Sequence, residues 1–219
     1  MIKITATIFL DLDGTLLNTS KRHYKLYKDI LNEMPHNKGS MFSHQKFWSM
    51  KRAGIKTRDI LPASLSNEII TSFEEEWLQK IEKKSYLQYD EPFPGMKNIL
   101  SDLNKKFDLI LVTLRNNTGN LHWELSKLGL KSYFKSIICG EGPKKKLVEG
   151  YLRDNPDEKC IIIGDTEEDI KTGLKLEITT ISVTWGIRSR AFLEDFNPDF
   201  CTDSFQEMRD IINYHLHGE

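Results

Sequence analysis

The sequence predicts an α/β protein built on a parallel sheet with helices on both faces. Five short apolar segments are rich in isoleucine and valine and are continuous rather than alternating, which is typical of strands buried on both sides. Helical patterns separate most of these segments, as parallel strands require. One long break, residues 18–91, follows the first segment and shows no convincing strand. We therefore expect a core domain from residues 1–17 and 92–219, with a small all-helical domain, residues 18–91, inserted after the first strand.

The expected elements can be bounded from their patterns. In the inserted domain, apolar residues recur at helical spacing over residues 24–34 and 69–81. Ser66 is suited to begin the second of these helices, and Gly129 is suited to end a helix in the core. The core strands are expected at residues 5–10, 107–114, 135–140, 159–165 and 178–185, and the core helices at 120–130, 144–152, 169–177 and 205–216.

Composition narrows the class of protein. The 219 residues are 39% hydrophobic and 29% charged, which is a globular profile, and the formal net charge is -1. Such a chain has no overall field to recruit nucleic acid or an anionic membrane, and no apolar run approaches the roughly 20 residues of a membrane span. The N-terminal residues lack the pattern of a signal peptide. We expect a cytoplasmic monomer or homodimer with no nucleic-acid or membrane partner, in which Cys139, Cys160 and Cys201 are buried reduced thiols.

Polar side chains follow three of the expected strands at the points where those strands end. Ligands of open α/β sheets bind beyond the carboxyl ends of the strands, so these side chains should meet on one rim. The acid after the last of these strands, Asp165, is followed four residues later by Asp169. This spacing is about one turn of helix, so both side chains should lie on the same side. The residues are Asp11 and Asp13, then Thr113 and Arg115, then Asp165 and Asp169.

The chemistry of this set points to phosphoryl transfer. Three or four carboxylates in a small space repel one another, and a hard divalent cation with oxygen ligands relieves the repulsion. Mg²⁺ is the usual choice beside phosphate. The Thr113 hydroxyl and a lysine at the helix start in GPKKK would stabilise the transferring group.

The segments DLDGT, VTLR, GPKKK and GDTEED resemble, in order, the four motifs of the haloacid dehalogenase superfamily. The resemblance covers nearly the whole chain, and it is closest to the phosphatases that are similar to phosphoglycolate phosphatase and β-phosphoglucomutase. It implies a Rossmann-like, doubly wound core, and the inserted domain resembles the helical C1-type cap of that branch. The ordered set is much more specific than DxDGT or GDxxxD alone.

The resemblance also implies a role for each matching residue. Asp11 would be the nucleophile that becomes an aspartyl phosphate, and Asp13 the general acid and then the base. Mg²⁺ would be bound by Asp11, the backbone carbonyl of Asp13 and Asp165, with Asp169 acting directly, through water or from farther out. Thr113 and one lysine would hold the phosphoryl group. Family members that cleave carbon–halogen or phosphonate bonds lack the second aspartate, so its presence argues against those activities.

Two of the phosphate contacts stay open at this point. Common relatives have a lysine–proline pair before the helix, whereas here Pro143 precedes three lysines. When Leu147 and Val148 are placed on the family's apolar helical pair, the resemblance makes Lys144 the first choice and Lys145 the second, and Lys146 is also possible. Arg115 is balanced between a contact with phosphate or substrate and a surface ion pair.

The inserted domain carries a candidate specificity segment, residues 51–61. Related enzymes have a substrate-specificity loop at this place, and Arg52, Gly54 and Arg58 would then meet the leaving group, with Lys56 as a further candidate. The alternative is an exposed basic turn between two helices.

These features predict an enzyme, a Mg²⁺-dependent phosphatase that acts on a small phosphorylated metabolite similar to phosphoglycolate or a sugar phosphate. Within the family, a phosphosugar mutase is the alternative. Outside it, a receiver-like phosphoacceptor also uses aspartate, threonine and lysine with Mg²⁺, and a non-catalytic binding protein would have no turnover.

Overall fold

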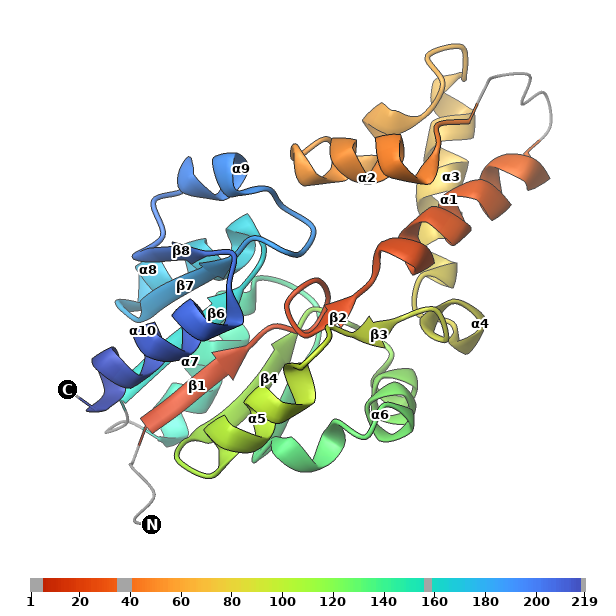
Figure 1. The fold of residues 1–219 in the computed structure, drawn as a ribbon. Coiled ribbons are helices and arrows are strands. Elements are labelled where there is room, and N and C mark those ends of the chain that lie inside the picture. Colours follow the sequence, from red (N-terminus) through yellow and green to blue (C-terminus); the bar gives the residue numbers. More distant parts are fainter. Residues whose placement is uncertain (1–5, 35–40, 156–158, 218–219) are drawn as a thin grey trace.

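The computed structural model describes residues 6–34, 41–155 and 159–217, and its core is a six-stranded sheet whose strands are all parallel (Figure 1). The strand order is β5-β4-β1-β6-β7-β8. The chain therefore builds outward on one side of β1, returns, and builds outward on the other side, which is a doubly wound fold. The strands are β1 (Ala6–Leu10), β4 (Asp108–Thr113), β5 (Ser136–Cys139), β6 (Lys159–Gly164), β7 (Thr179–Val183) and β8 (Phe200–Thr202).

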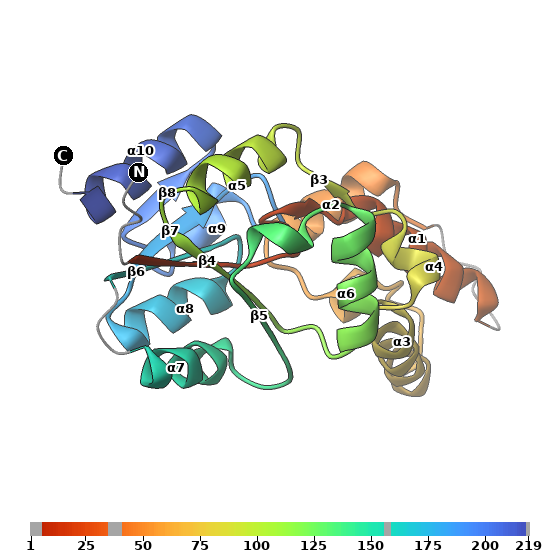
Figure 2. The same ribbon diagram turned by 90° about the horizontal axis from the view of Figure 1, so that it is seen from below.

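Helices cover both faces of this sheet (Figure 2). On one face, Ile8 and Leu10 of β1 belong to the same apolar cluster as side chains of α5 and α10. On the other face, Phe9 clusters with Val148 of α7. Burial on both sides explains why the strands read as continuous apolar runs. The core helices are α5 (Met96–Asn104), α6 (Thr118–Lys127), α7 (Lys144–Asp154), α8 (Glu167–Leu176), α9 (Arg190–Glu194) and α10 (Phe205–His217).

The predicted fold class is confirmed, and the five expected strands and four expected core helices are present with ends shifted by a few residues. In the described part of the core, β8, α5, α9 and a 3₁₀ helix (Lys131–Tyr133) were not expected. The edge strand β8 has three residues and pairs with β7 alone, so it lacks the long apolar run of a central strand. The three cysteines were expected to be buried, but each of them is only half-buried.

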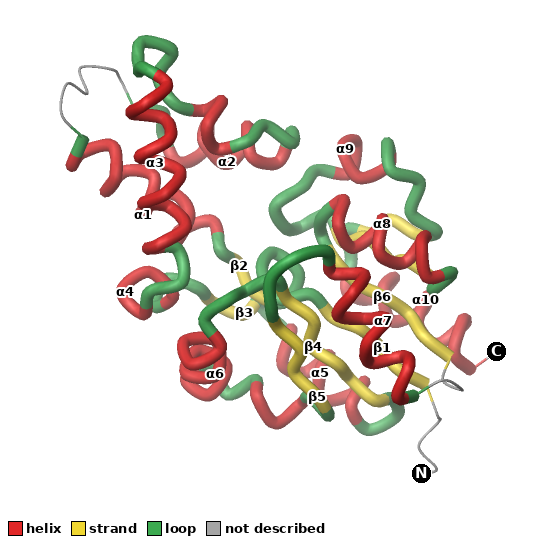
Figure 3. The backbone as a smooth tube through the Cα atoms, turned by 180° about the vertical axis from the view of Figure 1, so that it is seen from behind, coloured by secondary structure: helices red, strands yellow, loops and turns green. Residues whose placement is uncertain are grey.

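The insertion after β1 is helical and has its own apolar centre (Figure 3). Tyr27, Phe47 and Phe73, from three of its helices, are fully buried there. Ser66 occupies the N-cap position of α3, as expected. The insertion consists of α1 (Ser20–Glu33), α2 (His44–Arg52), a 3₁₀ helix (Thr57–Ile60), α3 (Asn67–Lys80) and α4 (Lys84–Leu87).

A two-stranded ribbon connects the insertion to the core. Strand β2 (Leu17–Asn18) pairs antiparallel with β3 (Glu91–Pro92), so the expectation of no strand in residues 18–91 is wrong at both ends of that segment. Strands of two residues carry no readable periodicity. The predicted domain boundaries fall inside this ribbon and stay a prediction.

In the described part of the chain, no helix is both long and apolar enough to cross a membrane.

Candidate active site

The structure brings the polar residues of three neighbouring strand ends together. Asp11 follows β1, Thr113 ends β4 and Asp165 follows β6, and β1 lies between the other two strands. A cleft of about 240 Å³ opens above this rim. Its lining includes five of the predicted core site residues: Asp11, Asp13, Thr113, Arg115 and Lys144.

A cluster of buried carboxylates lies at the floor of the site. Oxygens of Asp11, Asp165 and Asp169 all lie within 4.8 Å of one another. The Thr15 hydroxyl is 3.0 Å from Asp165 Oδ1 and 3.3 Å from Asp11 Oδ2. Burial raises the pKa of Asp11 to about 6 against the opposing effect of Lys144, and burial with the neighbouring aspartates raises the pKa of Asp165 well above its ordinary value.

This donor set fits a divalent cation. Several carboxylate oxygens in one buried place are the ligands that Mg²⁺ prefers, and the burial that raises the pKa of Asp11 and of Asp165 makes their ionised forms costly without a nearby cation. All three carboxylates already accept hydrogen bonds: Asp165 from the Thr15 hydroxyl and the Ile187 backbone N–H, Asp11 from Thr15 and Lys144, and Asp169 from Thr166 and Lys144. Each of the three also offers one oxygen to the same small space, so all three are candidate ligands.

The DLDGT motif requires glycine at position 14 for two reasons. The φ of Gly14 is 87°, a left-handed conformation that other residues seldom adopt. A Cβ at this position would also collide with the Asp165 carboxylate. The glycine therefore lets the loop after β1 approach the acid at the end of β6.

Among the three candidate lysines, Lys144 is the one placed at the carboxylates. It is the first residue of α7 and is buried, and its Nζ donates to Asp11 Oδ1 at 2.6 Å and to Asp169 Oδ1. Burial alone would lower the pKa of Lys144, but the two aspartates raise it above its ordinary value. Lys145 and Lys146 line a different groove, between α7 and α8.

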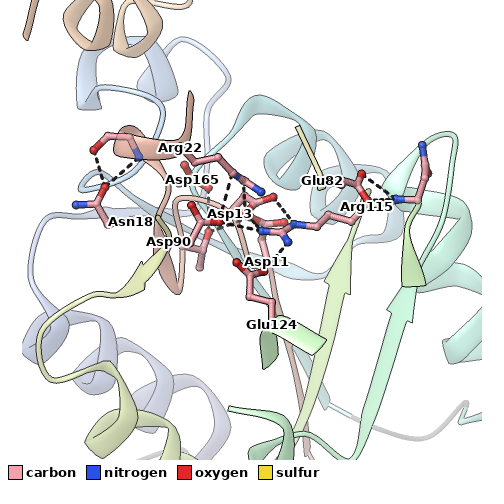
Figure 4. Close-up of polar contacts among 12 residues, drawn as sticks. Asp11, Asp13, Asn18, Arg22, Glu82, Asp90, Arg115, Glu124 and Asp165 are labelled. Atoms are coloured by element: carbon pink, nitrogen blue, oxygen red, sulfur yellow. Dashed lines mark hydrogen bonds and ion pairs between the residues drawn. The ribbon is translucent and has the colours of Figure 1, made fainter. Parts of the chain in front are cut away.

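Asp13 is clamped between two arginines (Figure 4). Arg22 Nη2 donates to its Oδ1 at 2.8 Å, while Arg115 donates from Nη2 to Oδ1 at 2.5 Å and from Nε to Oδ2 at 2.8 Å. Burial alone would raise the pKa of Asp13, but Arg115 and Arg22 lower it well below its usual range. Asp13 is therefore a carboxylate in this arrangement.

Two further acids, Asp90 and Glu124, form ion pairs with these arginines, so that Asp13, Arg22 and Arg115 belong to a second buried cluster of charges. Asp90 lies 3.3 Å from Arg22 Nε and from Arg115 Nη2, and Glu124 lies 2.5 Å from Arg115 Nη1. Burial raises the pKa of both carboxyl groups. Arg115 is 3% exposed, so the surface ion pair considered for it is wrong: its ion pairs are internal. Asp90 and Glu124 went unnoticed in the sequence because neither lies near a motif.

The three cap residues expected to meet a leaving group do not line the cleft. Arg52 donates to the backbone oxygens of Gly186 at 2.6 Å and Thr184 at 2.7 Å, which joins α2 to the loop after β7. Gly54 lies against the Phe192 ring with a φ of 83°. Arg58 lies 3.5 Å from Glu74, within the cap.

Other cap residues line the cleft instead: Arg22 and His23 of α1, and Ile81 and Glu82 just after α3. The Glu82 carboxylate accepts hydrogen bonds from the backbone N–H groups of Asn116 and Asn117, the shortest at 2.7 Å. Ile81 is the last residue of the apolar helical pattern over residues 69–81, which indicates a side chain that packs inside the cap. Nothing in that pattern indicates that Ile81 also lines the cleft.

Comparison with known proteins assigns this arrangement to a family. The model of the haloacid dehalogenase-like hydrolases matches residues 8–183. The chain belongs to this family. It is 25% identical to pyrophosphatase PpaX of Bacillus mycoides, an alignment that covers 94% of this chain and 96% of the relative.

Solved structures of other bacterial proteins share the fold. One from Haemophilus somnus, described as a predicted phosphoglycolate phosphatase, has a TM-score of 0.72 at 18% identity and covers 97% of this chain and 99% of its own. The HAD-hydrolase YfnB of Bacillus subtilis, solved bound to magnesium, has a TM-score of 0.63 at 20% identity and covers 96% of this chain and 100% of its own. The predicted family is confirmed, and the chain is a haloacid dehalogenase-like hydrolase.

Proposed function

We propose that the protein is a Mg²⁺-dependent phosphatase that hydrolyses a small phosphorylated metabolite. The observation that carries this proposal is the placement of Asp11 beside two further buried carboxylates and Lys144, at the floor of an open cleft. A cleft of about 240 Å³ is below the range of drug-sized pockets, so the substrate is small.

In the proposed reaction, an Asp11 oxygen attacks phosphorus and the bond to the leaving oxygen breaks, which gives an aspartyl phosphate. Asp13 protonates the leaving oxygen and then takes a proton from the water that hydrolyses the acyl phosphate. Between Arg22 and Arg115, Asp13 is in the form that a base needs. To act as the acid it must gain a proton, which release from the arginines favours.

Other residues hold the reacting groups. Thr113 and Lys144 would bind the phosphoryl oxygens, and the carboxylates of Asp11 and Asp165 with the Asp13 carbonyl would hold the cation. Bound Mg²⁺ supplies positive charge between an anionic nucleophile and an anionic phosphate. The magnesium-bound relative YfnB supports this choice of cation.

The direct test is phosphate release from a panel of small phosphorylated compounds. We expect Mg²⁺-dependent release from at least one of them, loss of activity in EDTA, and recovery when Mg²⁺ is added in excess. Product analysis separates hydrolysis from transfer to a second hydroxyl, which a mutase would give. Turnover that is unchanged by EDTA would contradict the metal-dependent mechanism, and a stable phosphoprotein without turnover would favour a receiver-like role.

A second prediction distinguishes the lysines. We expect Lys144→Ala to lower kcat/KM for phosphate release by at least about 100-fold, because its ammonium group is the cation at Asp11. Lys145→Ala is the matched control and should stay within about twofold, as expected for a surface change away from the site. Equal losses in the two variants would contradict the assignment.

A further inference from the structure

The cations that line the cleft are already committed to carboxylates. Lys144 binds Asp11, Arg22 binds Asp13 and Asp90, and Arg115 binds Asp13, Asp90 and Glu124. Among the described residues that line the cleft, there is no other lysine or arginine. Even when Asp13 leaves the arginines to take up a proton, Arg22 keeps its ion pair with Asp90, and Arg115 keeps its ion pairs with Asp90 and Glu124. With Lys144 assigned to the transferring phosphoryl group, every cation of the lining has a carboxylate partner, and none is left for a second anionic group.

The ionised side chains of the lining also have a negative balance. Three cations face four carboxylates, Asp11, Asp13, Glu82 and Glu168, which gives 3 − 4 = −1. Glu82 is fixed at the cap edge by its bonds to two backbone N–H groups. An anionic leaving group would meet this carboxylate without a compensating charge.

The remaining lining is apolar or neutral. Ile81, Leu114 and Ile187 supply aliphatic surface. His23 lies edge-on to the rings of Trp48 and Trp77, at centroid distances of 6.0 and 5.7 Å. Burial, with the nearby charges of Arg22 and Lys51, lowers the pKa of His23 well below its ordinary value, so the imidazole is neutral. A neutral imidazole offers hydrogen bonding that suits a hydroxyl group.

We propose that the substrate is a phosphate monoester of an uncharged alcohol or polyol, and that Ile81 and Leu114 exclude leaving groups that carry a carboxylate or a second phosphate. This inference rests on the phosphatase function proposed above and names its substrate class. It separates this chain from the substrates in its relatives' names, pyrophosphate and phosphoglycolate.

A matched pair of substrates tests the proposal. 2-Hydroxyethyl phosphate and 2-phosphoglycolate have the same skeleton and differ in a hydroxymethyl group against a carboxylate, and pyrophosphate adds a phosphate leaving group. We expect the wild-type kcat/KM for 2-hydroxyethyl phosphate to exceed that for either anionic substrate by at least about tenfold, the effect of one uncompensated charge near a protein surface.

Substitutions of Ile81 and Leu114, which form the apolar wall of the cleft, should change the ratio of kcat/KM for 2-phosphoglycolate to kcat/KM for 2-hydroxyethyl phosphate. Ile81→Lys places a cation at the cap side of the cleft and should raise kcat/KM for 2-phosphoglycolate relative to 2-hydroxyethyl phosphate by about tenfold. Leu114→Lys, at a position already 38% exposed, tests the same idea if Ile81→Lys fails to fold. Leu78→Lys is the control, because Leu78 of α3 is 75% exposed and does not line the cleft.

A wild-type preference for 2-phosphoglycolate or pyrophosphate would overturn the inference and leave the phosphatase function intact. An unchanged ratio in both lysine variants of the wall would also overturn it, whereas no phosphate release from any substrate would overturn the proposed function itself.

Discussion

Replacing Asp11 by asparagine should abolish phosphate release, with a loss of at least about 10⁴-fold in kcat. The amide has nearly the same shape, so the fold of the loop after β1 should survive. It has no anionic oxygen to attack phosphorus, and it contributes one negative charge less to the carboxylate cluster that would hold the cation. Steady-state phosphate release measures the loss, and intact-mass spectrometry after an acid quench should detect a phosphorylated enzyme in the wild type alone.

The same chemical change elsewhere serves as the control. Asp102 lies on α5, is half-exposed, and pairs with Lys105 at 3.1 Å. Asp102→Asn should keep activity within about twofold, because substitutions at the surface, away from the active site and from buried contacts, have small effects. If Asp11→Asn retained more than a tenth of the wild-type rate, the nucleophile would have to be sought elsewhere.

The sequence was sufficient for the floor of the site because one geometric rule connects its residues. Parallel strands present their carboxyl ends on one edge, so residues that follow separate apolar runs must meet there. This places Asp11, Thr113 and Asp165 without any knowledge of pairing. The helix that begins at Lys144 follows the same logic, since its apolar side, which includes Val148, packs on the sheet and directs the first lysine to the rim.

The upper part of the site was not predictable in the same way. Its geometry depends on how the cap meets the core, and those contacts come from residues far apart in the sequence. Asn120 of α6, for example, donates to the Glu82 backbone oxygen at 2.9 Å across 38 positions. Residues 51–61 were expected to contact the substrate by analogy with the loops of related enzymes. The Arg52 guanidinium instead donates hydrogen bonds to backbone carbonyl groups of the core. No periodicity or motif reports such a contact.

The largest effect on stability is expected for Arg115→Met. Among the described residues, this change leaves Glu124 without its ion pair to Arg115, and it leaves Asp13 and Asp90 with Arg22 as their remaining ion-pair partner. Breaking a buried ion pair on one side costs about 3–5 kcal/mol, because the other charge stays buried without compensation. For a chain of this size that corresponds to a fall in Tm of about 6–20 °C, measurable by calorimetry or circular dichroism.

Two comparisons show whether the loss comes from the buried charges. Arg58→Met removes an arginine that is 47% exposed and 3.5 Å from Glu74, and it should cost no more than about 1 kcal/mol. The double variant Arg115→Met/Glu124→Met removes one of the stranded acids and should recover part of the stability, since an ion pair replaced on both sides by apolar groups is often neutral. A fall in Tm for Arg115→Met no larger than that for Arg58→Met would mean that the cluster is hydrated rather than buried. Asp13 would then be free to take up a proton without first leaving its arginines.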